Sequence, residues 1–280
     1  MPADAIDLDA YTERIGYSGG REPSLETLQA LHALHPAAIP FENLSPLLGL
    51  GVDLDAVALQ DKLVTRKRGG YCFEHNLLFL HVLKTLGFQV KGLAARVLWN
   101  LPEQVVLPRT HMLLLVDIDN VNYIADVGFG GLTMTAPLRL NPAMEQTSPH
   151  ELFRLTYADR GYTLQVKLNE SWNAMYTFDL QQQHQADYEL MNWYVSSHPR
   201  SRFVNELIAA RPDKTHRHAL LNHEYTAHYL DGKTEKRTLG NVTDMREILE
   251  TAFHIPLDDL PGVKEKLESL LIAVQYAKNR

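Results

Sequence analysis

The chain has 280 residues, 45% of them hydrophobic and 22% charged, which is a globular composition and excludes a disordered or collagen-like chain. Its single cysteine excludes an intrachain disulfide and a cysteine-based zinc site. With 27 basic and 34 acidic residues the net charge is −7, so we expect no non-specific binding to nucleic acid or to an anionic membrane.

The first 87 residues are predicted to be mainly helical. Ser24 is a suitable N-cap for a helix with an apolar stripe, which Pro36 is expected to end. The strongest helix prediction covers residues 72–86, where apolar side chains surround most of the axis, as in a buried helix. Gly87 follows in the C′ position, where a left-handed backbone suits glycine.

From about residue 90 the pattern changes to short segments rich in Val, Leu and Ile that are separated by polar turns. Strands are expected over residues 91–99, 112–118, 121–127, 153–157, 162–168 and 174–180. Several short strands close together in a chain favour a small barrel or sandwich.

The last third of the chain has a mixed pattern. A hairpin is expected over residues 225–230 and 235–239, around Asp231-Gly232, and helices over residues 244–253 and 263–277. The sequence therefore predicts a compact α+β protein in three consecutive parts.

Cys72 begins the predicted buried helix, directly after Arg68-Gly69-Gly70-Tyr71. Unpaired N–H groups and the positive dipole end of a helix N-terminus favour a thiolate, and the basic run Arg66-Lys67-Arg68 acts in the same direction. Free cysteines are also common as inert core residues, so a non-catalytic small-molecule binding module is an alternative. The position at a helix start makes Cys72 a candidate nucleophile.

A thiolate nucleophile works with a histidine that a third group orients. His111 is the informative one of 13 histidines because it leads a very apolar strand, although a hydrogen-bonded structural histidine is the competing interpretation. The strands on either side of Asp119-Asn120 should pair as a hairpin. One register places His111 opposite Asp126, a second makes them a diagonal pair on one face, and a one-residue slip separates them. Asp117 lies about 20 Å along the same strand and is too distant to orient His111.

Glycines at positions 128, 130 and 131 follow Asp126, without the third glycine of a dinucleotide fingerprint because position 133 is Thr. They form either a flexible turn or a loop that lets a phosphate-bearing ligand approach the backbone. The segment Gly232-Lys233-Thr234 lacks the leading glycine of a phosphate loop. The spacing of His216, His218, His223 and His228 fits neither H-E-x-x-H nor a zinc finger, and we expect no metal.

These segments resemble the motifs of the arylamine N-acetyltransferase family, bacterial type. Residues 68–76 (RGGYCFEHN) resemble its R-G-G-x-C-x-E-x-N signature, and residues 110–111 (TH) and 126–130 (DVGFG) resemble its histidine and aspartate motifs in the same order. Residues 40–44 (PFENL) resemble an N-terminal element of the family, and residues 192–199 (NWYVSSHP) with Phe203 resemble the segment that joins its barrel to its lid. The similarity covers residues 40 to 205 and is weaker towards the C-terminus.

The resemblance implies a helical bundle (1–87) carrying the nucleophile, a β-barrel (88–190) carrying histidine and aspartate, and a linker with an α/β lid (191–280). It implies a cysteine-protease-like triad of Cys72, His111 and Asp126. This triad would move an acetyl group from acetyl-CoA through a Cys72 thioester to arylamines, arylhydrazines or N-hydroxyarylamines. Acetyl-CoA would be a co-substrate, and no cofactor would be tightly bound.

The resemblance also implies contacts for both substrates. Phe41, Phe129 and Phe203 are similar to the aromatic walls of the acceptor pocket, and Thr110, Gly128 and Gly130 to contacts with the pantetheine and phosphates of CoA. The Cys72 backbone N–H is one expected oxyanion donor.

A papain-like or transglutaminase-like thiol enzyme acting on amides remains an alternative, because such enzymes share the order Cys, His, then Asn or Asp. No apolar run reaches membrane-spanning length, and Met1-Pro2-Ala3-Asp4 lacks the basic and apolar blocks of a signal peptide. We therefore expect a cytoplasmic protein, where a lone thiol stays reduced.

Overall fold

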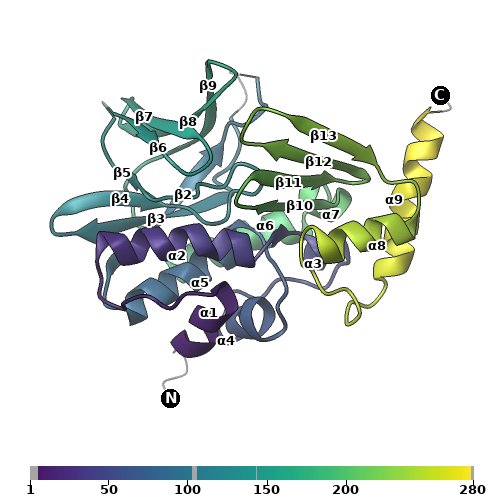
Figure 1. Ribbon diagram of the computed structural model, residues 1–280, viewed down its shortest axis with the longest axis horizontal. Helices are drawn as coiled ribbons and strands as arrows, with labels where there is room; N and C mark the ends of the chain where they lie inside the picture. The colour runs from purple at the N-terminus through teal and green to yellow at the C-terminus, as the bar shows by residue number, and fades with distance from the viewer. Residues whose placement is uncertain (1–5, 103–105, 143, 279–280) are drawn as a thin grey trace.

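The computed structural model describes residues 6–102, 106–142 and 144–278 (Figure 1). The first four residues, used above to argue against a signal peptide, lie outside these ranges. Among the described residues, none of the helices combines the length and apolarity needed to span a bilayer. The predicted α+β class is confirmed: N-terminal helices precede an eight-stranded antiparallel sheet that curves into a near-closed barrel, and a five-stranded sheet with helices follows.

The N-terminal helices are α1 (Leu8–Ile15), α2 (Leu25–Ala38), α3 (Leu44–Leu47), α4 (Ala56–Gln60), the π-helix η1 (Asp61–Thr65) and α5 (Cys72–Thr85). Ser24 caps α2 as predicted, since its hydroxyl accepts a hydrogen bond from the Thr27 N–H. The prediction that Pro36 ends α2 is wrong. Proline removes only its own N–H from the last turn, and the helix still closes with a bond from Ile39 N to His35 O at 2.8 Å.

Helix α5 lies at the centre of the N-terminal part and packs against strands β2 and β3 (Figure 1). Every side chain from Cys72 to Leu80 is buried, which confirms the prediction of a helix that is enclosed nearly all round. Gly87, just beyond the end of α5, has φ +87° as predicted. Burial on all sides fixes the direction of α5 and therefore the position of Cys72 at its first residue.

The barrel strands are β2 (Gln89–Val97), β3 (His111–Ile118), β4 (Val121–Ala125), β5 (Leu138–Arg139), β6 (Glu145–Thr147), β7 (Leu152–Ala158), β8 (Gly161–Leu168) and β9 (Ser171–Phe178). Their order in the sheet is β5-β4-β3-β2-β9-β8-β7-β6. The six predicted strands are confirmed with small shifts at their ends. Strands β5 and β6 were not predicted, because two or three residues are too few to show an alternating pattern.

The β3–β4 hairpin takes the second of the two registers considered. Ile118 pairs with Val121, and Asp119 and Asn120 form the turn with φ +53° and +64°. Strand β4 ends at Ala125, so Asp126 follows directly after the last ladder pair, on the same face as His111.

The C-terminal part contains α6 (Gln185–Ser197), α7 (Arg202–Asn205), β10 (Ile208–Pro212), β11 (His216–Leu221), β12 (Glu224–Tyr229), β13 (Thr234–Thr238), α8 (Val242–Thr251) and α9 (Val263–Lys278). The predicted β12–β13 hairpin and the two closing helices are confirmed. The sheet has the order β1-β10-β11-β12-β13, and its first strand is the two-residue β1 (Phe41–Glu42) from the N-terminal part. The pattern did not predict this exchange, and it brings Phe41 to the C-terminal sheet.

Candidate active site

Cys72 occupies the first turn of α5, and its side chain is 4% exposed. The Glu74 carboxylate accepts the Tyr71 N–H at 3.0 Å, which caps the helix and fixes the residue before the cysteine. The Cys72 thiol donates to the Thr110 carbonyl oxygen, with 3.6 Å between sulfur and oxygen. This contact joins the start of α5 to the start of β3, where His111 lies.

His111 and Asp126 are both buried, and His111 Nε2 lies 2.7 Å from Asp126 Oδ2. Burial alone would lower the pKa of His111, but the charge and hydrogen bond of Asp126, with the Cys72 sulfur nearby, raise it to about 10. Burial would raise the pKa of Asp126, yet pairing with His111 and further hydrogen bonds hold it below the usual value. The geometry therefore supports an imidazolium–carboxylate pair beside the thiol.

Asn76, one turn after Cys72 on α5, holds the other carboxylate oxygen of Asp126. Its amide nitrogen donates to Asp126 Oδ1 at 3.0 Å and to the Met112 carbonyl oxygen at 2.8 Å, and its oxygen accepts the Val127 N–H at 3.1 Å. Asn76 stands in the signature motif, but no role was predicted for it. Its position four residues after Cys72, on the same face of a helix, was the available signal.

Gly128 lies where the strand end passes directly over α5. A Cβ atom at this position would lie 2.9 Å from the Cys72 Cα and 3.0 Å from the His75 Cβ. Glycine is therefore required by close backbone approach, whatever its role towards a ligand.

Aromatic rings surround the triad candidates. The His111 ring centroid lies 5.2 Å from that of Phe129 and 4.9 Å from that of Tyr176 on β9. On the other side, Phe203 contacts Phe41 with centroids 6.1 Å apart. Tyr176 was not predicted as a site residue, because nothing in the β9 pattern distinguishes it from other inward-facing side chains.

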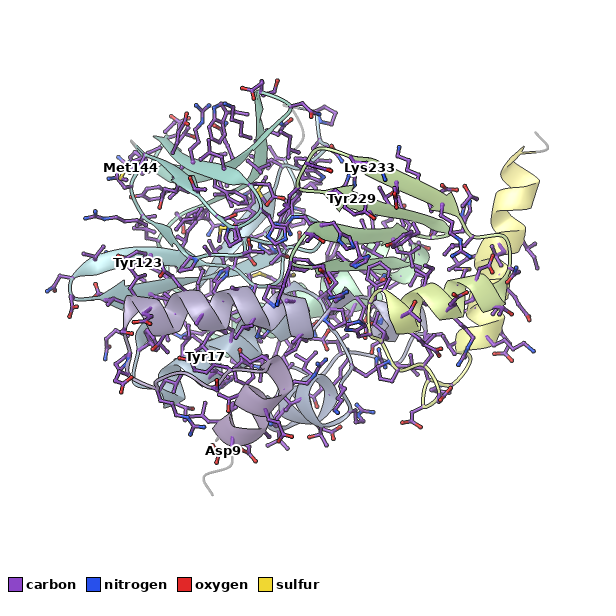
Figure 2. All side chains as sticks on the ribbon, viewed as in Figure 1. Asp9, Tyr17, Tyr123, Met144, Tyr229 and Lys233 are labelled. Atoms are coloured by element: carbon purple, nitrogen blue, oxygen red, sulfur yellow. The ribbon has the colours of Figure 1, made fainter. Side chains whose placement is uncertain are left out.

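A cavity of about 1340 Å³ lies between the barrel and the C-terminal sheet. Its wall includes eight of the nine predicted site residues, namely Phe41, Cys72, Thr110, His111, Gly128, Phe129, Gly130 and Phe203. Asp126 is fully buried behind His111. The far wall comes from the β12–β13 hairpin and includes Tyr229, which lies beside Lys233 in Figure 2, with Lys233 Nζ 5.5 Å from the ring centroid.

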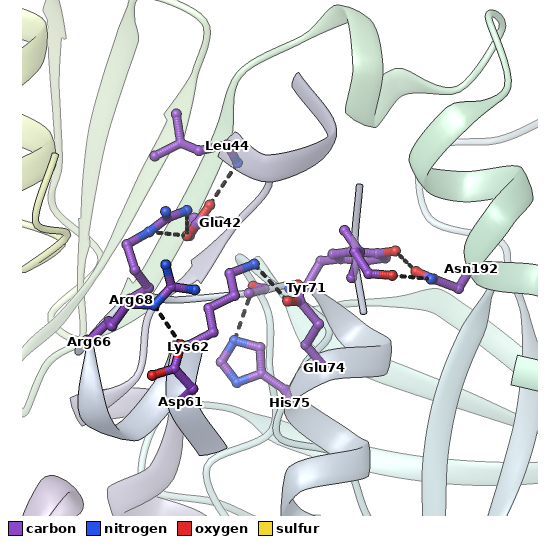
Figure 3. A network of polar contacts seen from close by, with 12 residues as sticks. Glu42, Leu44, Asp61, Lys62, Arg66, Arg68, Tyr71, Glu74, His75 and Asn192 are labelled. Carbon is purple, nitrogen blue, oxygen red and sulfur yellow. Dashed lines mark hydrogen bonds and ion pairs between the residues drawn. The ribbon is translucent and has the colours of Figure 1, made fainter. Parts of the chain in front are cut away.

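One buried ion pair and one half-exposed ion pair involve the segment that precedes Cys72 (Figure 3). The Arg68 guanidinium donates to Glu42 Oε1 at 2.9 and 2.5 Å, and Glu42 Oε2 accepts the Leu44 N–H at 2.6 Å. Arg66 pairs with Asp61 at 2.8 Å. Two cations of the basic run are therefore compensated by carboxylates, and Arg68 acts by fixing backbone position.

On the opposite side of the same segment, Lys62 pairs with Glu74 at 2.6 Å, and Tyr71 hydrogen-bonds to Asn192 of α6 (Figure 3).

Within the ranges that the structure describes, no group of three or more His, Cys, Asp or Glu side chains is arranged to hold a metal ion.

The sequence and the fold are similar to those of known acetyltransferases. The sequence model of an N-acetyltransferase family matches residues 24–261. An arylamine N-acetyltransferase of Mycobacterium tuberculosis is 43% identical over 269 residues, which are 95% of this chain and 94% of the relative. A protein of Salmonella typhimurium named arylamine N-acetyltransferase / N-hydroxyarylamine O-acetyltransferase is 39% identical over 255 residues, 90% of each chain. The solved structure of Mycobacterium marinum arylamine N-acetyltransferase in complex with CoA superposes with a TM-score of 0.90 at 41% identity, covering 95% of this chain and 98% of that one.

Proposed function

The chain belongs to the arylamine N-acetyltransferase family, its activity is the acetylation of arylamines, and we propose that Cys72, His111 and Asp126 carry the acetyl transfer. The observation that supports this assignment is the buried His111–Asp126 pair, which meets the thiol at the cavity wall. The arrangement is that of a thiol-protease-like triad with the nucleophile on a helix start.

In the first half-reaction, the Cys72 thiolate attacks the thioester carbonyl carbon of acetyl-CoA. A bond forms between the Cys72 sulfur and the acetyl carbon, the bond from that carbon to the CoA sulfur breaks, and the His111 imidazolium protonates the departing CoA thiolate. The Cys72 backbone N–H, free of intrahelical bonding at the first position of α5, stabilises the oxyanion.

In the second half-reaction, the amine nitrogen of the acceptor attacks the acetyl carbon on Cys72. Neutral His111 accepts the proton that the amine loses, and the Cys72 thiolate leaves, which restores the ion pair. Asp126 stabilises the imidazolium of the free enzyme and the imidazolium that forms again when the acceptor amine loses its proton, because its charge is held within hydrogen-bonding distance of His111 Nε2. N-hydroxyarylamines are further proposed acceptors, as in the name of the Salmonella typhimurium relative.

Acetyl-CoA acts as a co-substrate, and Thr110, Gly128 and Gly130 are proposed to contact its pantetheine and phosphates. Support comes from their place on the cavity wall and from the CoA complex of the Mycobacterium marinum relative. Phe41, Phe129 and Phe203 are proposed to bind the aromatic ring of the acceptor between them.

Each proposed part then has a task. The helical part (1–87) supplies Cys72, the barrel (88–190) supplies His111 and Asp126, and residues 191–280 cover the cavity as a lid. The chemistry needs a reduced thiol, so we place the enzyme in the cytoplasm.

The test is mass spectrometry of the intact protein after mixing with acetyl-CoA in the absence of an acceptor. One acetyl group is expected on Cys72, and it should be released on addition of an arylamine. Cys72→Ser is the control and should carry none. An unmodified wild-type chain, or acetylation that Cys72→Ser retains, would refute the proposal.

A further inference from the structure

Behind Asp126, on the side away from the cavity, lie three histidines that take no part in the proton transfers described above. His32 and His35 belong to α2 and His75 to α5, and all three side chains are fully buried. Buried histidines need hydrogen-bond partners that match one protonation state, so their contacts reveal which nitrogen carries the proton.

His35 and His75 form a chain with a single direction. His75 Nε2 lies 3.1 Å from both the Pro40 and the Gly70 carbonyl oxygens, and it must donate because carbonyls only accept. His75 Nδ1 then accepts from His35 Nε2 at 3.0 Å, and His35 Nδ1 accepts from the Tyr11 hydroxyl at 2.9 Å. Burial lowers the pKa of both rings, which agrees with this direction and with neutral rings. The chain connects α1 and α2 to the segments before Phe41 and Cys72.

His32 makes a different contact, to the backbone of Asp126. The Asp126 N–H donates to His32 Nε2 at 3.1 Å, so this nitrogen carries no proton and Nδ1 must carry it. His32 Nδ1 is buried and has no hydrogen-bond partner in the described part of the chain. The Nδ1–H donor of the ring is therefore unpaired, while Nε2 accepts the hydrogen bond from the Asp126 N–H.

Few groups face the His32 ring. Phe79 of α5 approaches edge-on with centroids 6.0 Å apart, His35 lies on the same helix, and the Asp126 carboxylate is the charge that acts on it. Burial lowers the pKa of His32 to about 4 despite the opposing charge of Asp126, which agrees with a neutral acceptor at neutral pH.

Asp126 lies one residue beyond the end of β4, where its backbone N–H is no longer part of the sheet ladder. Its carboxylate is held by Asn76 and by the Gly128 N–H at 3.0 Å, and its backbone by His32. We propose that His32 is a positioning residue for acetyl transfer, which accepts the Asp126 N–H and so aims the carboxylate at His111. This role rests on the proposed function, because it acts through Asp126.

The test compares His32→Gln with His32→Asn. A Gln side chain can place its oxygen where Nε2 lies and accept the Asp126 N–H, whereas the shorter Asn side chain ends near the Nδ1 position and cannot. His32→Gln should acetylate Cys72 at close to the wild-type rate. His32→Asn should be slower by roughly tenfold to a hundredfold, as small displacements in catalytic geometry are.

The pH profile of Cys72 alkylation by iodoacetamide separates positioning from simple loss of structure. With Asp126 misplaced, the Cys72–His111 ion pair is less stable, so the acidic edge of the profile should move to higher pH in His32→Asn and stay in place in His32→Gln. Leu28→Ala, one turn earlier on α2 in the same core, is the control: it should lower stability without moving the edge. Equal rates and equal profiles for the Gln and Asn variants would overturn the proposal.

The tautomer of His32 can be measured in the wild-type protein, so this test does not depend on whether a variant folds. Nitrogen-15 NMR at neutral pH should show His32 with its proton on Nδ1, and a proton on Nε2 would also overturn the proposal. Failure of the wild type to become acetylated would instead refute the proposed function and leave the tautomer result as a separate outcome.

Discussion

At the scale of single residues, the charge of Asp126 determines whether the triad can exist as an ion pair. Asp126→Asn keeps the shape and removes the charge that raises the pKa of His111 to about 10, so burial then favours the neutral ring. Acetylation of Cys72 should fall by about 10³–10⁴-fold in single-turnover measurements with acetyl-CoA.

The matched control for this variant is Asp117→Asn in the same hairpin. Asp117 caps the turn by accepting the Asn120 N–H at 3.1 Å and is remote from His111. The Asp117→Asn variant should therefore acetylate Cys72 at the wild-type rate. Retention of full activity by Asp126→Asn would contradict the triad assignment.

The sequence predicted the three triad candidates because each stands at a recognisable place: a helix start, a strand start and a charged position in an apolar strand. The residues that surround them were harder to predict. Asn76 is 50 positions from Asp126 and His32 is 94 positions from it, so neither contact leaves a local pattern. Tyr176 reaches His111 only because β9 pairs with β2, and β2 pairs in turn with β3.

At the scale of elements, the start of α5 is held by β1 through the buried Arg68–Glu42 pair. Glu42 is fully buried and Arg68 nearly so, so Glu42→Gln leaves a guanidinium without its charge partner. The free energy of unfolding, measured with urea, should fall by about 3–5 kcal/mol.

The control for Glu42→Gln is Asp9→Asn, which breaks an ion pair between side chains 49% and 86% exposed. An exposed pair of this kind contributes less than about 1 kcal/mol, so the midpoint should hardly move. A similar loss for the two variants would mean that burial of the Arg68–Glu42 pair has no special role.

Prediction of elements succeeded where the apolar pattern is long and failed where it is short or interrupted. Helix α5 was predicted because its side chains are apolar on nearly every face. Strands β10 and β11 were missed because buried polar residues, Arg211, Arg217 and His218, interrupt their apolar pattern. Helix α6 was missed because its buried face includes Asn192 and Ser196, and polar residues of this kind are normally expected on the solvent-exposed face of a helix.

At the scale of the whole molecule, the buried histidines should make the protein sensitive to acid. Burial lowers the pKa of His32 and of His75 to about 4, below the value of about 6.5 in an unfolded chain. The unfolded state therefore binds more protons below pH 6.5, and stability should decline by a few kcal/mol as the pH falls from about 6.5 to about 4. Urea unfolding across this range measures the decline.

His111 acts in the opposite direction, because its pKa in the folded protein is raised. Its contribution to the free energy of unfolding is complete below about pH 6.5 and is lost as the pH rises towards 10.

Two variants test the loss of stability in acid. His75→Gln should make the free energy of unfolding fall less between about pH 6.5 and 4, whereas replacing the exposed His184 should leave that fall unchanged. A free energy of unfolding that stays constant between about pH 6.5 and 4 would contradict this account.

The pairing of β1 with β10 also bears on how the chain reaches its active form during synthesis. Phe41 and Glu42 emerge from the ribosome long before residues 208–212, which form the neighbouring strand. Until that later segment is made, Glu42 lacks its strand partner and the cavity lacks the wall that β10 to β13 provide. A growing chain therefore carries its only thiol before it has an enclosed pocket, and we expect acetyl transfer only after β13, which ends at Thr238 in the chain of 280 residues, has been translated.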